Sequence, residues 1–153
     1  MRKIPNYATH LFACGKDAGD WMFGKNSYQI LHNAIDTKIY QYDYQKRKES
    51  RTKLGIGEEL LIGHVGRFRL QKNHVFLIDI FAEIVKQQPD SKLLLVGDGD
   101  EKEKIQEKIE QLQLQKKVLL LGARSDVNEL MQAMDVFVFP SLYEGLPLTM
   151  IEA

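Results

Sequence analysis

Four short, continuous apolar runs that end in glycine or proline constrain the fold of this chain more than any other feature. They occupy residues 59–66 (ELLIGHVG), 92–97 (KLLLVG), 118–122 (VLLLG) and 135–140 (DVFVFP). Their apolar residues are consecutive and do not alternate with polar ones, which is typical of strands covered on both faces, as in a parallel sheet. The sequence therefore predicts four parallel strands.

Three amphipathic stretches separate these runs, at residues 75–87, 101–114 and 126–134. Each keeps its apolar residues on one side at spacings of three and four, which indicates helices. Strand and helix in alternation indicate right-handed crossovers. With 153 residues and 44% apolar content the chain can bury one sizeable core. We therefore expect an α/β fold with a Rossmann-like, doubly wound parallel sheet.

The first third of the chain is less regular. Residues 11–13 and 28–31 are candidate strands on either side of a candidate helix at residues 16–22. Residues 40–50 are polar, charged and rich in tyrosine, so we expect a surface excursion that leads into a short helix near Lys53.

The last residues, 147–153 (PLTMIEA), read as the start of a helix with Pro147 at its first position. No stop signal follows within this apolar pattern. The sequence therefore predicts a lobe that is incomplete at its C-terminus, which would leave apolar surface exposed and favour self-association.

Composition excludes several classes of partner and site. Lysine plus arginine equals aspartate plus glutamate, at 21 each, which gives no electrostatic reason to expect nucleic acid. The single cysteine, Cys14, cannot form an internal disulfide, and no apolar stretch approaches the ~20 residues of a membrane span. We expect a soluble, cytoplasmic protein. The spacing of the four histidines suits no metal, and His64 reads as a satisfied core residue.

The loops after the predicted strands carry the candidate site, because ligands of open parallel sheets bind beyond the carboxyl ends of the strands. Gly66 lets the backbone approach a ligand, and Arg67 and Lys72 could clamp a diphosphate. On spacing alone, two solvated loop cations explain these residues equally well; their place at a strand end favours binding. The turn containing Gly97 is more often structural.

The last predicted loop and helix hold two glutamates, Glu144 and Glu152, which can face different parts of an elongated ligand. Between them, the amides of Leu148 and Thr149 are unpaired at the helix start and offer an anion site. By spacing alone two glutamates mean little, since Glu152 could face solvent.

Taken in order, these segments resemble the C-terminal lobe of family-four retaining glycosyltransferases, which have the GT-B fold. The resemblance covers about residues 8–153, and its strongest mark is Glu144 and Glu152 separated by seven residues after a Pro-Ser loop. Residues 32–36 (HNAID) resemble the family's Pro-Asn-Gly-Ile-Asp linker, although His32 and Ala34 replace its proline and glycine.

The resemblance implies a role for each matching residue. Arg67 and Lys72 would bind the donor diphosphate without a metal or other cofactor, and Glu144 would contact hydroxyls of the transferred sugar. The remaining contacts would come from the backbone of Gly145 and Leu146 near sugar and phosphate, from Glu152 at the ribose, and from Arg124 and Asp126 near the base. The base itself stays open, with uridine diphosphate the common donor nucleotide in similar enzymes.

The resemblance also implies the domain organisation and activity. Residues 1–26 would end an N-terminal acceptor lobe, and residues 27–153 would form a truncated donor-binding lobe. The intact enzyme would transfer a sugar with retention to a glycan or lipid-linked acceptor, with possible peripheral membrane association, whereas this piece alone would be inactive. The alternative is a non-catalytic sugar-nucleotide-binding module or one subunit of a split transferase. A dehydrogenase is disfavoured, because no strand is followed by Gly-x-Gly-x-x-Gly.

Overall fold

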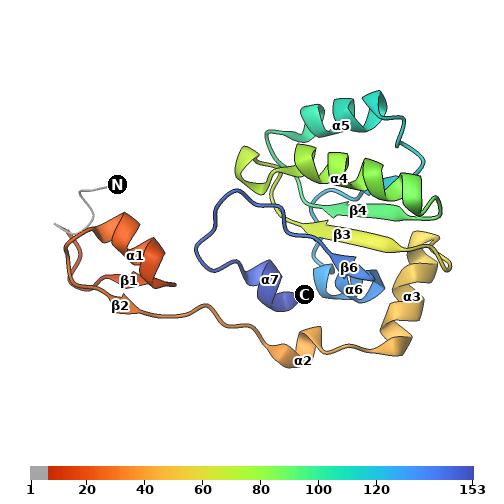
Figure 1. The fold of residues 1–153 in the computed structure, drawn as a ribbon. Helices are drawn as coiled ribbons and strands as arrows, with labels where there is room; N and C mark the ends of the chain where they lie inside the picture. The colour runs from red at the N-terminus through yellow and green to blue at the C-terminus, as the bar shows by residue number, and fades with distance from the viewer. Residues whose placement is uncertain (1–6) are drawn as a thin grey trace.

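A four-stranded parallel sheet forms the centre of the molecule in the computed structural model, which describes residues 7–153. Its strands are β3 (Leu61–Val65), β4 (Lys92–Val96), β5 (Val118–Leu120) and β6 (Val136–Phe137), in the spatial order β5-β4-β3-β6. The chain builds outward from β3 to β5 and then returns to place β6 on the other side of β3 (Figure 1). This reversal confirms the doubly wound parallel sheet predicted from the four apolar runs.

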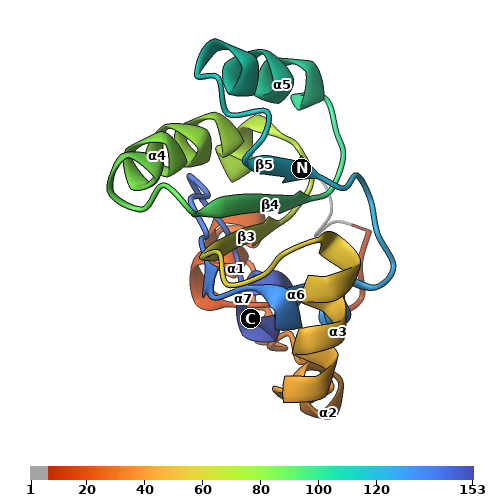
Figure 2. The ribbon, with the colours of Figure 1, turned by 90° about the vertical axis from the view of Figure 1, so that its right-hand side faces the viewer.

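Helices cover both faces of this sheet. Figure 2 shows β5, β4 and β3 between α4 (His74–Gln87) and α5 (Lys102–Gln111) on one side and α3 (Tyr44–Leu54) and α6 (Val127–Ala133) on the other. The second predicted helix ends three residues early, at Gln111, because Gln113 has a positive φ of 56° that breaks the helical path. The other two predicted helices match within about two residues.

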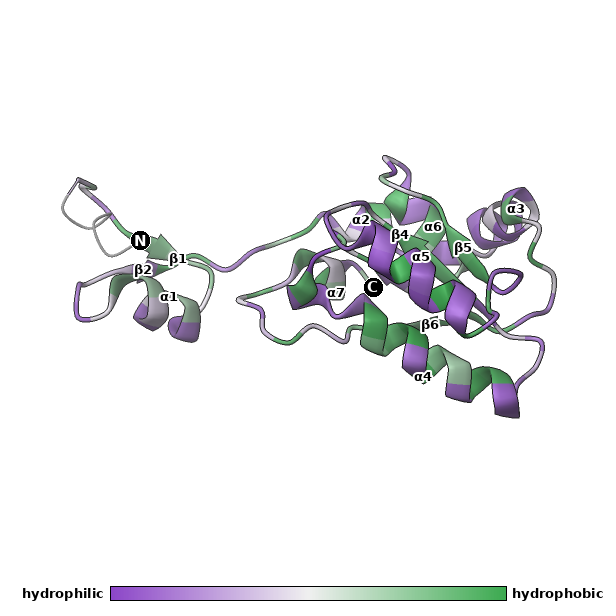
Figure 3. Ribbon diagram, turned by 90° about the horizontal axis from the view of Figure 1, so that it is seen from above, coloured by the Kyte–Doolittle hydropathy of each residue, from purple (hydrophilic) through white to green (hydrophobic). Residues whose placement is uncertain are grey.

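Alternate residues of each strand enter one of two hydrophobic clusters. Ile62, Leu93 and Leu95 pack beneath α4 and α5, whereas Leu61 and Leu94 pack against α3 and α6. Each of these residues is at most 2% exposed, so burying each one contributes roughly 2 kcal/mol. Much of β4 and β5 is coloured as hydrophobic in Figure 3. The strands are continuous apolar runs in the sequence because both of their faces are buried.

The segment predicted as a polar surface excursion is mostly exposed but helical. The helix expected near Lys53 is confirmed as α3, although it begins nine residues before Lys53, at Tyr44. Residues 40–50 contain the end of α2 (Thr37–Tyr40) and most of α3, which begins where the Asp43 side chain accepts hydrogen bonds from the amides of Gln45 and Lys46. The helix has no apolar stripe. It is held instead by Arg47 and Arg51, which donate hydrogen bonds to the backbone around α6.

The N-terminal segment folds as a small unit beside the main sheet (Figure 1). It contains β1 (Phe12–Ala13), α1 (Lys16–Phe23) and β2 (Gln29–Ile30), with the two strands paired in parallel. The strand, helix and strand predicted here are confirmed. An extended connection then leads to α2.

The chain ends in a short helix, α7 (Leu148–Glu152). Pro147 is the residue before this helix and has an extended backbone, so its predicted place as the first helical residue is off by one position. Throughout residues 7–153, no helix combines the length and the apolar character that crossing a membrane requires.

Candidate functional site

The carboxyl ends of β3 and β6 mark the point where the direction of strand addition reverses, which is where open α/β sheets bind ligands. The loop after β3, residues 66–73, and the loop after β6, residues 138–147, meet at this point. Gln71 joins them twice, since its carbonyl accepts from the Leu142 amide at 2.8 Å and its side chain donates to the Tyr143 carbonyl at 2.7 Å. These bonds fix the positions of both loops.

Lys72 and Glu144 contact each other across these two loops. Lys72 Nζ lies 2.8 Å from Glu144 Oε1, and the side chains are only 17% and 19% exposed. The contact is an ion pair without hydrogen-bond geometry, because Oε1 is buried and has no correctly aligned donor among the described residues. Lys72 Nζ also lies 4.9 Å from the centre of the Phe139 ring. The structure thus brings together two of the three predicted catalytic residues.

Two buried histidines form the floor beneath this ion pair. The rings of His64 and His74 meet edge to face with their centres 4.8 Å apart, and His64 Nδ1 lies 2.8 Å from the Val138 carbonyl. Burial lowers the pKa of His64 to about 4 and that of His74 to about 3, with nearby Lys72 also disfavouring the charged forms. Both rings are therefore neutral at pH 7.

The prediction that His64 is a satisfied core residue is only half correct. Its Nδ1 is bonded, but its Nε2 has no hydrogen-bond partner among residues 7–153. Both ring nitrogens of His74 and the Ser141 hydroxyl are likewise buried without partners in the described chain. Buried polar atoms are usually paired, so this concentration of unpaired atoms is typical of a functional site.

The glycines at the ends of β3 and β4 allow the two backbones to touch. A Cβ on Gly97 would lie 1.9 Å from the Gly66 carbonyl oxygen, and one on Gly99 would lie 2.5 Å from that of Phe68. Both glycines also have positive φ angles, 145° and 156°. Gly97 therefore has the structural role that its turn sequence favours, and it borders the site through Gly66.

Arg67 follows Gly66 directly and is exposed at the carboxyl end of β3. It lies on the same loop as Lys72, which makes this loop the positive side of the site. A Cβ on Gly66 would lie 3.5 Å from Lys72 Cδ and 3.0 Å from His64 Nε2. Glycine at this position therefore keeps the space above the histidines open.

Arg124 and Asp126 lie farther along the same edge, after β5. Their side chains pair with each other at 2.6 Å, and this pairing raises the pKa of Arg124 and lowers that of Asp126. β5 is two strands away from β3, which places this loop about 10 Å along the edge. Arg124 and Asp126 therefore lie on the same edge of the sheet as Lys72 and Glu144, but farther from the carboxyl ends of β3 and β6.

Glu152 faces a different neighbour from Glu144. Burial and a hydrogen bond with Glu152 raise the pKa of the Tyr40 hydroxyl, which comes from α2. The two glutamates therefore have different neighbours, Lys72 for Glu144 and Tyr40 for Glu152. Leu148 and Thr149 begin α7 between them, with Leu148 exposed.

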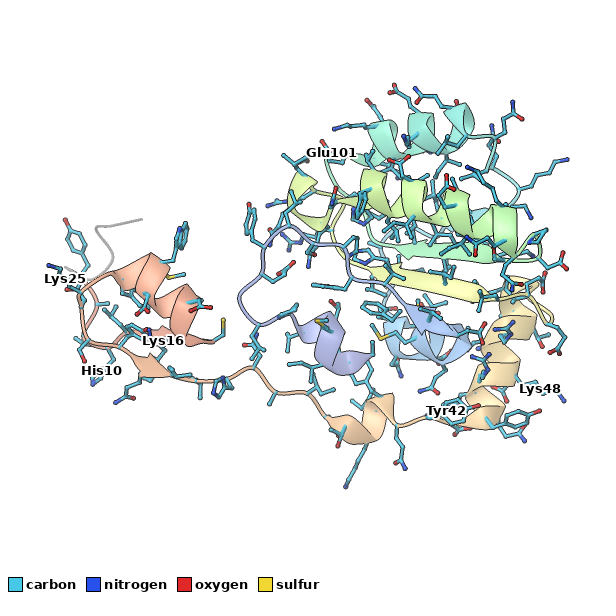
Figure 4. The ribbon with its side chains drawn as sticks, in the orientation of Figure 1. His10, Lys16, Lys25, Tyr42, Lys48 and Glu101 are labelled. Carbon is cyan, nitrogen blue, oxygen red and sulfur yellow. The ribbon has the colours of Figure 1, made fainter. Side chains whose placement is uncertain are left out.

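The N-terminal unit borders the glycine of the last loop. A Cβ on Gly145 would lie 3.0 Å from Cys14 Sγ, and the Asn33 side chain donates a 2.7 Å hydrogen bond to the Leu146 carbonyl. His10 and Lys16 mark this unit in Figure 4, at the opposite end of the molecule from Tyr42 and Lys48. Sequence reasoning did not identify the contacts of Cys14, Asn33 and Tyr40, because each joins segments far apart in the chain.

The charges of this site suit an anionic ligand that also carries polar groups. Lys72, the glycine loop and buried Glu144 lie together where β3 and β6 end, and Arg67 follows β3 on the same loop as Lys72. Within residues 7–153, no group of three histidine, cysteine or acidic side chains is placed to hold a metal ion.

Comparison with known sequences identifies a family that fits this arrangement. The sequence model described as "Glycosyl transferases group 1" matches residues 46–153. The chain is 41% identical over 158 residues to a Bacillus subtilis (strain 168) protein that is named as glycosyltransferase EpsF. This match covers 99% of this chain and 41% of that protein. It is 32% identical over 128 residues to the Escherichia coli protein "UDP-Gal:alpha-D-GlcNAc-diphosphoundecaprenol alpha-1,3-galactosyltransferase", covering 81% of this chain and 33% of that protein.

Solved structures show the same fold. Anabaena Alr3699/HepE in complex with UDP-glucose superimposes with a TM-score of 0.87 at 24% identity, over 99% of this chain and 44% of that chain. The glycosyltransferase WaaG, involved in lipopolysaccharide biosynthesis, gives a TM-score of 0.77 at 23% identity, over 94% of this chain and 41% of that chain. The chain therefore spans about two fifths of these proteins and has the architecture of part of a GT-B glycosyltransferase.

Proposed function

This chain belongs to the glycosyl transferases group 1 family, and from that premise we propose that it binds a nucleotide-diphosphate sugar between the loops that follow β3 and β6. The observation that carries the proposal is the contact of Lys72 with Glu144 at 2.8 Å. This contact brings together a lysine, which can bind phosphate, and a glutamate, which can bind hydroxyl groups. It lies where the direction of strand addition in the sheet reverses.

Arg67 and Lys72 bind the diphosphate in this proposal. When the bond between sugar and phosphate breaks, negative charge grows on the leaving diphosphate. Fixed cations therefore stabilise the transition state more than the ground state. Lys72 is held in place by the Gln71 contacts and the Phe139 ring, so it needs little reorganisation.

The rest of the rim binds the two ends of the donor. Glu144 accepts hydrogen bonds from sugar hydroxyls, and the backbone of Gly145 and Leu146 lies beside the sugar and phosphate. Glu152 accepts from the ribose, and the loop with Arg124 and Asp126 borders the base. The distance of about 10 Å between β3 and β5 suits a ligand that extends from its diphosphate to its base.

The proposed donor is a uridine-diphosphate sugar. The relatives support this choice, since HepE is described in complex with UDP-glucose and the Escherichia coli relative is named for UDP-Gal. In the longer protein, residues 1–26 would end an acceptor lobe, and the sugar would pass with retention to a glycan or lipid-linked acceptor. Acceptor recognition would come from that lobe.

Isothermal titration calorimetry of the purified chain tests donor binding. We expect UDP and UDP-glucose to bind, ADP and GDP to bind more weakly, and Arg67→Ala to weaken both uridine ligands. Lys48→Ala, at an exposed position on α3, is the matched control and should change neither affinity. Absence of binding by all uridine nucleotides would contradict the proposal.

Transfer is tested in a protein that also carries an acceptor lobe. There, Arg67→Ala should lower turnover by roughly 100-fold, as the loss of one donor to an oxyanion commonly does. Donor binding without any transfer would instead favour a non-catalytic binding module.

A further inference from the structure

We propose that Glu144 makes this site discriminate between the donor sugar nucleotide and the nucleoside diphosphate that remains after transfer. The inference rests on the proposed function. It assigns to Glu144 a second task, which is to occupy Lys72 whenever no sugar is present and so to weaken binding of the free diphosphate.

The first support is the ion pair itself. Lys72 Nζ and Glu144 Oε1 lie 2.8 Å apart, and both side chains are more than four-fifths buried. Glu144 is also the one carboxylate paired with Lys72 among residues 7–153. A phosphate oxygen that approaches Lys72 must therefore share the ammonium group or displace Glu144.

The second support is the neutrality of the surroundings. The groups packed around Lys72 are Phe139 and the uncharged rings of His64 and His74. They supply no further charge to stabilise the lysine once Glu144 leaves. In such an apolar environment the attraction between the two charges is stronger than at an open surface.

The third support is the fixed position of the Glu144 loop. The Leu142 amide and the Tyr143 carbonyl on this loop are bonded to Gln71, one residue before Lys72. Neighbouring Leu146 is bonded to Asn33. The carboxylate therefore remains close to the diphosphate after Lys72 turns to the phosphate.

A carboxylate held there treats the two ligands differently. The sugar of the donor presents hydroxyl groups, which donate hydrogen bonds to Glu144 and replace the lost contact with Lys72. A free nucleoside diphosphate presents only phosphate oxygens at this place and carries more negative charge on its terminal phosphate. Glu144 then loses its ion pair with Lys72, gains no hydrogen-bond donor from the ligand, and faces the negative charge of the terminal phosphate. The site therefore favours the donor and releases the product.

The Glu144→Gln variant tests this by calorimetry with UDP and UDP-glucose as the ligands. We expect UDP to bind about tenfold more tightly than to the wild type, and UDP-glucose to bind about tenfold more weakly, because the neutral amide frees Lys72 but accepts sugar hydroxyls less well. Glu144→Ala should change the UDP affinity in the same direction and serves if the glutamine variant unfolds.

Two controls separate this effect from general damage. Glu152→Gln should weaken both ligands by similar factors, because both contain the ribose. In a Lys72→Met background, Glu144→Gln should raise UDP affinity by a smaller factor than in the wild type, because no ammonium group remains to be released and only the repulsion between the carboxylate and the phosphate is relieved.

Unchanged or weaker UDP binding by folded Glu144→Gln would overturn this inference while leaving the proposed function intact. Failure of the wild type to bind either ligand would contradict both. Opposite changes in the two affinities, with a larger gain in UDP affinity when Lys72 is present than in the Lys72→Met background, would support the inference.

Discussion

The two ends of the β3–β6 strand pair both carry a cluster of charged side chains, but the clusters are built differently. At the amino end, Arg51 pairs with Asp135 at 3.1 Å and donates to the carbonyls of Gly57, Glu59 and Ala133. At the carboxyl end, Lys72 pairs with Glu144 above two histidines.

Hydrogen bonding separates the two clusters. Although burial opposes its charge, Asp135 accepts from the Leu61 amide and from two arginines, which hold its pKa below the ordinary value. The carboxyl-end cluster instead contains buried atoms of His64, His74, Ser141 and Glu144 without hydrogen-bond partners in the described chain. A saturated network stabilises the fold, whereas an unsaturated one leaves capacity for a ligand.

The largest effect on stability is expected from Arg51→Met. This change removes one of the two arginines bonded to Asp135 and leaves the Gly57 and Glu59 carbonyls without their arginine donor, so it should lower the free energy of unfolding by about 3–5 kcal/mol. Urea denaturation measures it, with the exposed Lys48→Met on the same helix as the control. A loss below about 1 kcal/mol would mean that the amino-end network is not what attaches α3.

Lys72→Met should affect ligand binding more than stability. The free energy of unfolding should fall by less than in Arg51→Met, by about 1–3 kcal/mol, because Glu144 loses its buried partner but no aligned hydrogen bond is broken. UDP affinity should fall by about 10- to 100-fold, because a charged hydrogen bond to phosphate is lost. Urea denaturation and calorimetry on the same sample measure the two effects. A strong loss of stability with intact UDP binding would remove the contrast between the two ends.

The smallest effect at neutral pH is the pH dependence of the carboxyl-end cluster, which develops only on acidification. His64 and His74 have folded pKa values of about 4 and about 3, below the ordinary value of 6.5, so the unfolded chain binds more protons as pH falls. The free energy of unfolding should therefore be maintained above about pH 7 and decline by up to about 2.5 kcal/mol for each histidine between pH 6.5 and 4.5. This window lies above the titration of Asp135.

Urea denaturation at several pH values measures this decline. His74→Leu, which replaces a buried ring without hydrogen-bond partners by an apolar side chain of similar size, should flatten the curve. An equally steep curve in that variant would assign the pH dependence to other groups.

The sequence predicted the sheet well because its strands are buried on both faces and so are apolar throughout. It also placed Lys72 and Glu144 on one edge, since both follow strands. The polar segment that forms α3 lacks an apolar stripe, and periodicity could not identify it. Asp43 before this helix and Gly55 after it are the local signals that could have done so.

Other features depend on contacts that only the folded chain creates. The Arg51–Asp135 pair joins α3 to the residue before β6, 84 positions later, and no spacing in the sequence connects them. Nor does the sequence indicate that His64 keeps one nitrogen unpaired, because that depends on the loop that packs over it. Both features depend on the pairing of β6 with β3 in the folded chain.

The most direct test of the donor site is a crystal structure of this chain with UDP-glucose. We predict the diphosphate between the loops after β3 and β6, with Lys72 Nζ about 3 Å from a phosphate oxygen and Glu144 turned from Lys72 to a sugar hydroxyl. A diphosphate bound elsewhere, with the Lys72–Glu144 ion pair still closed, would contradict this account.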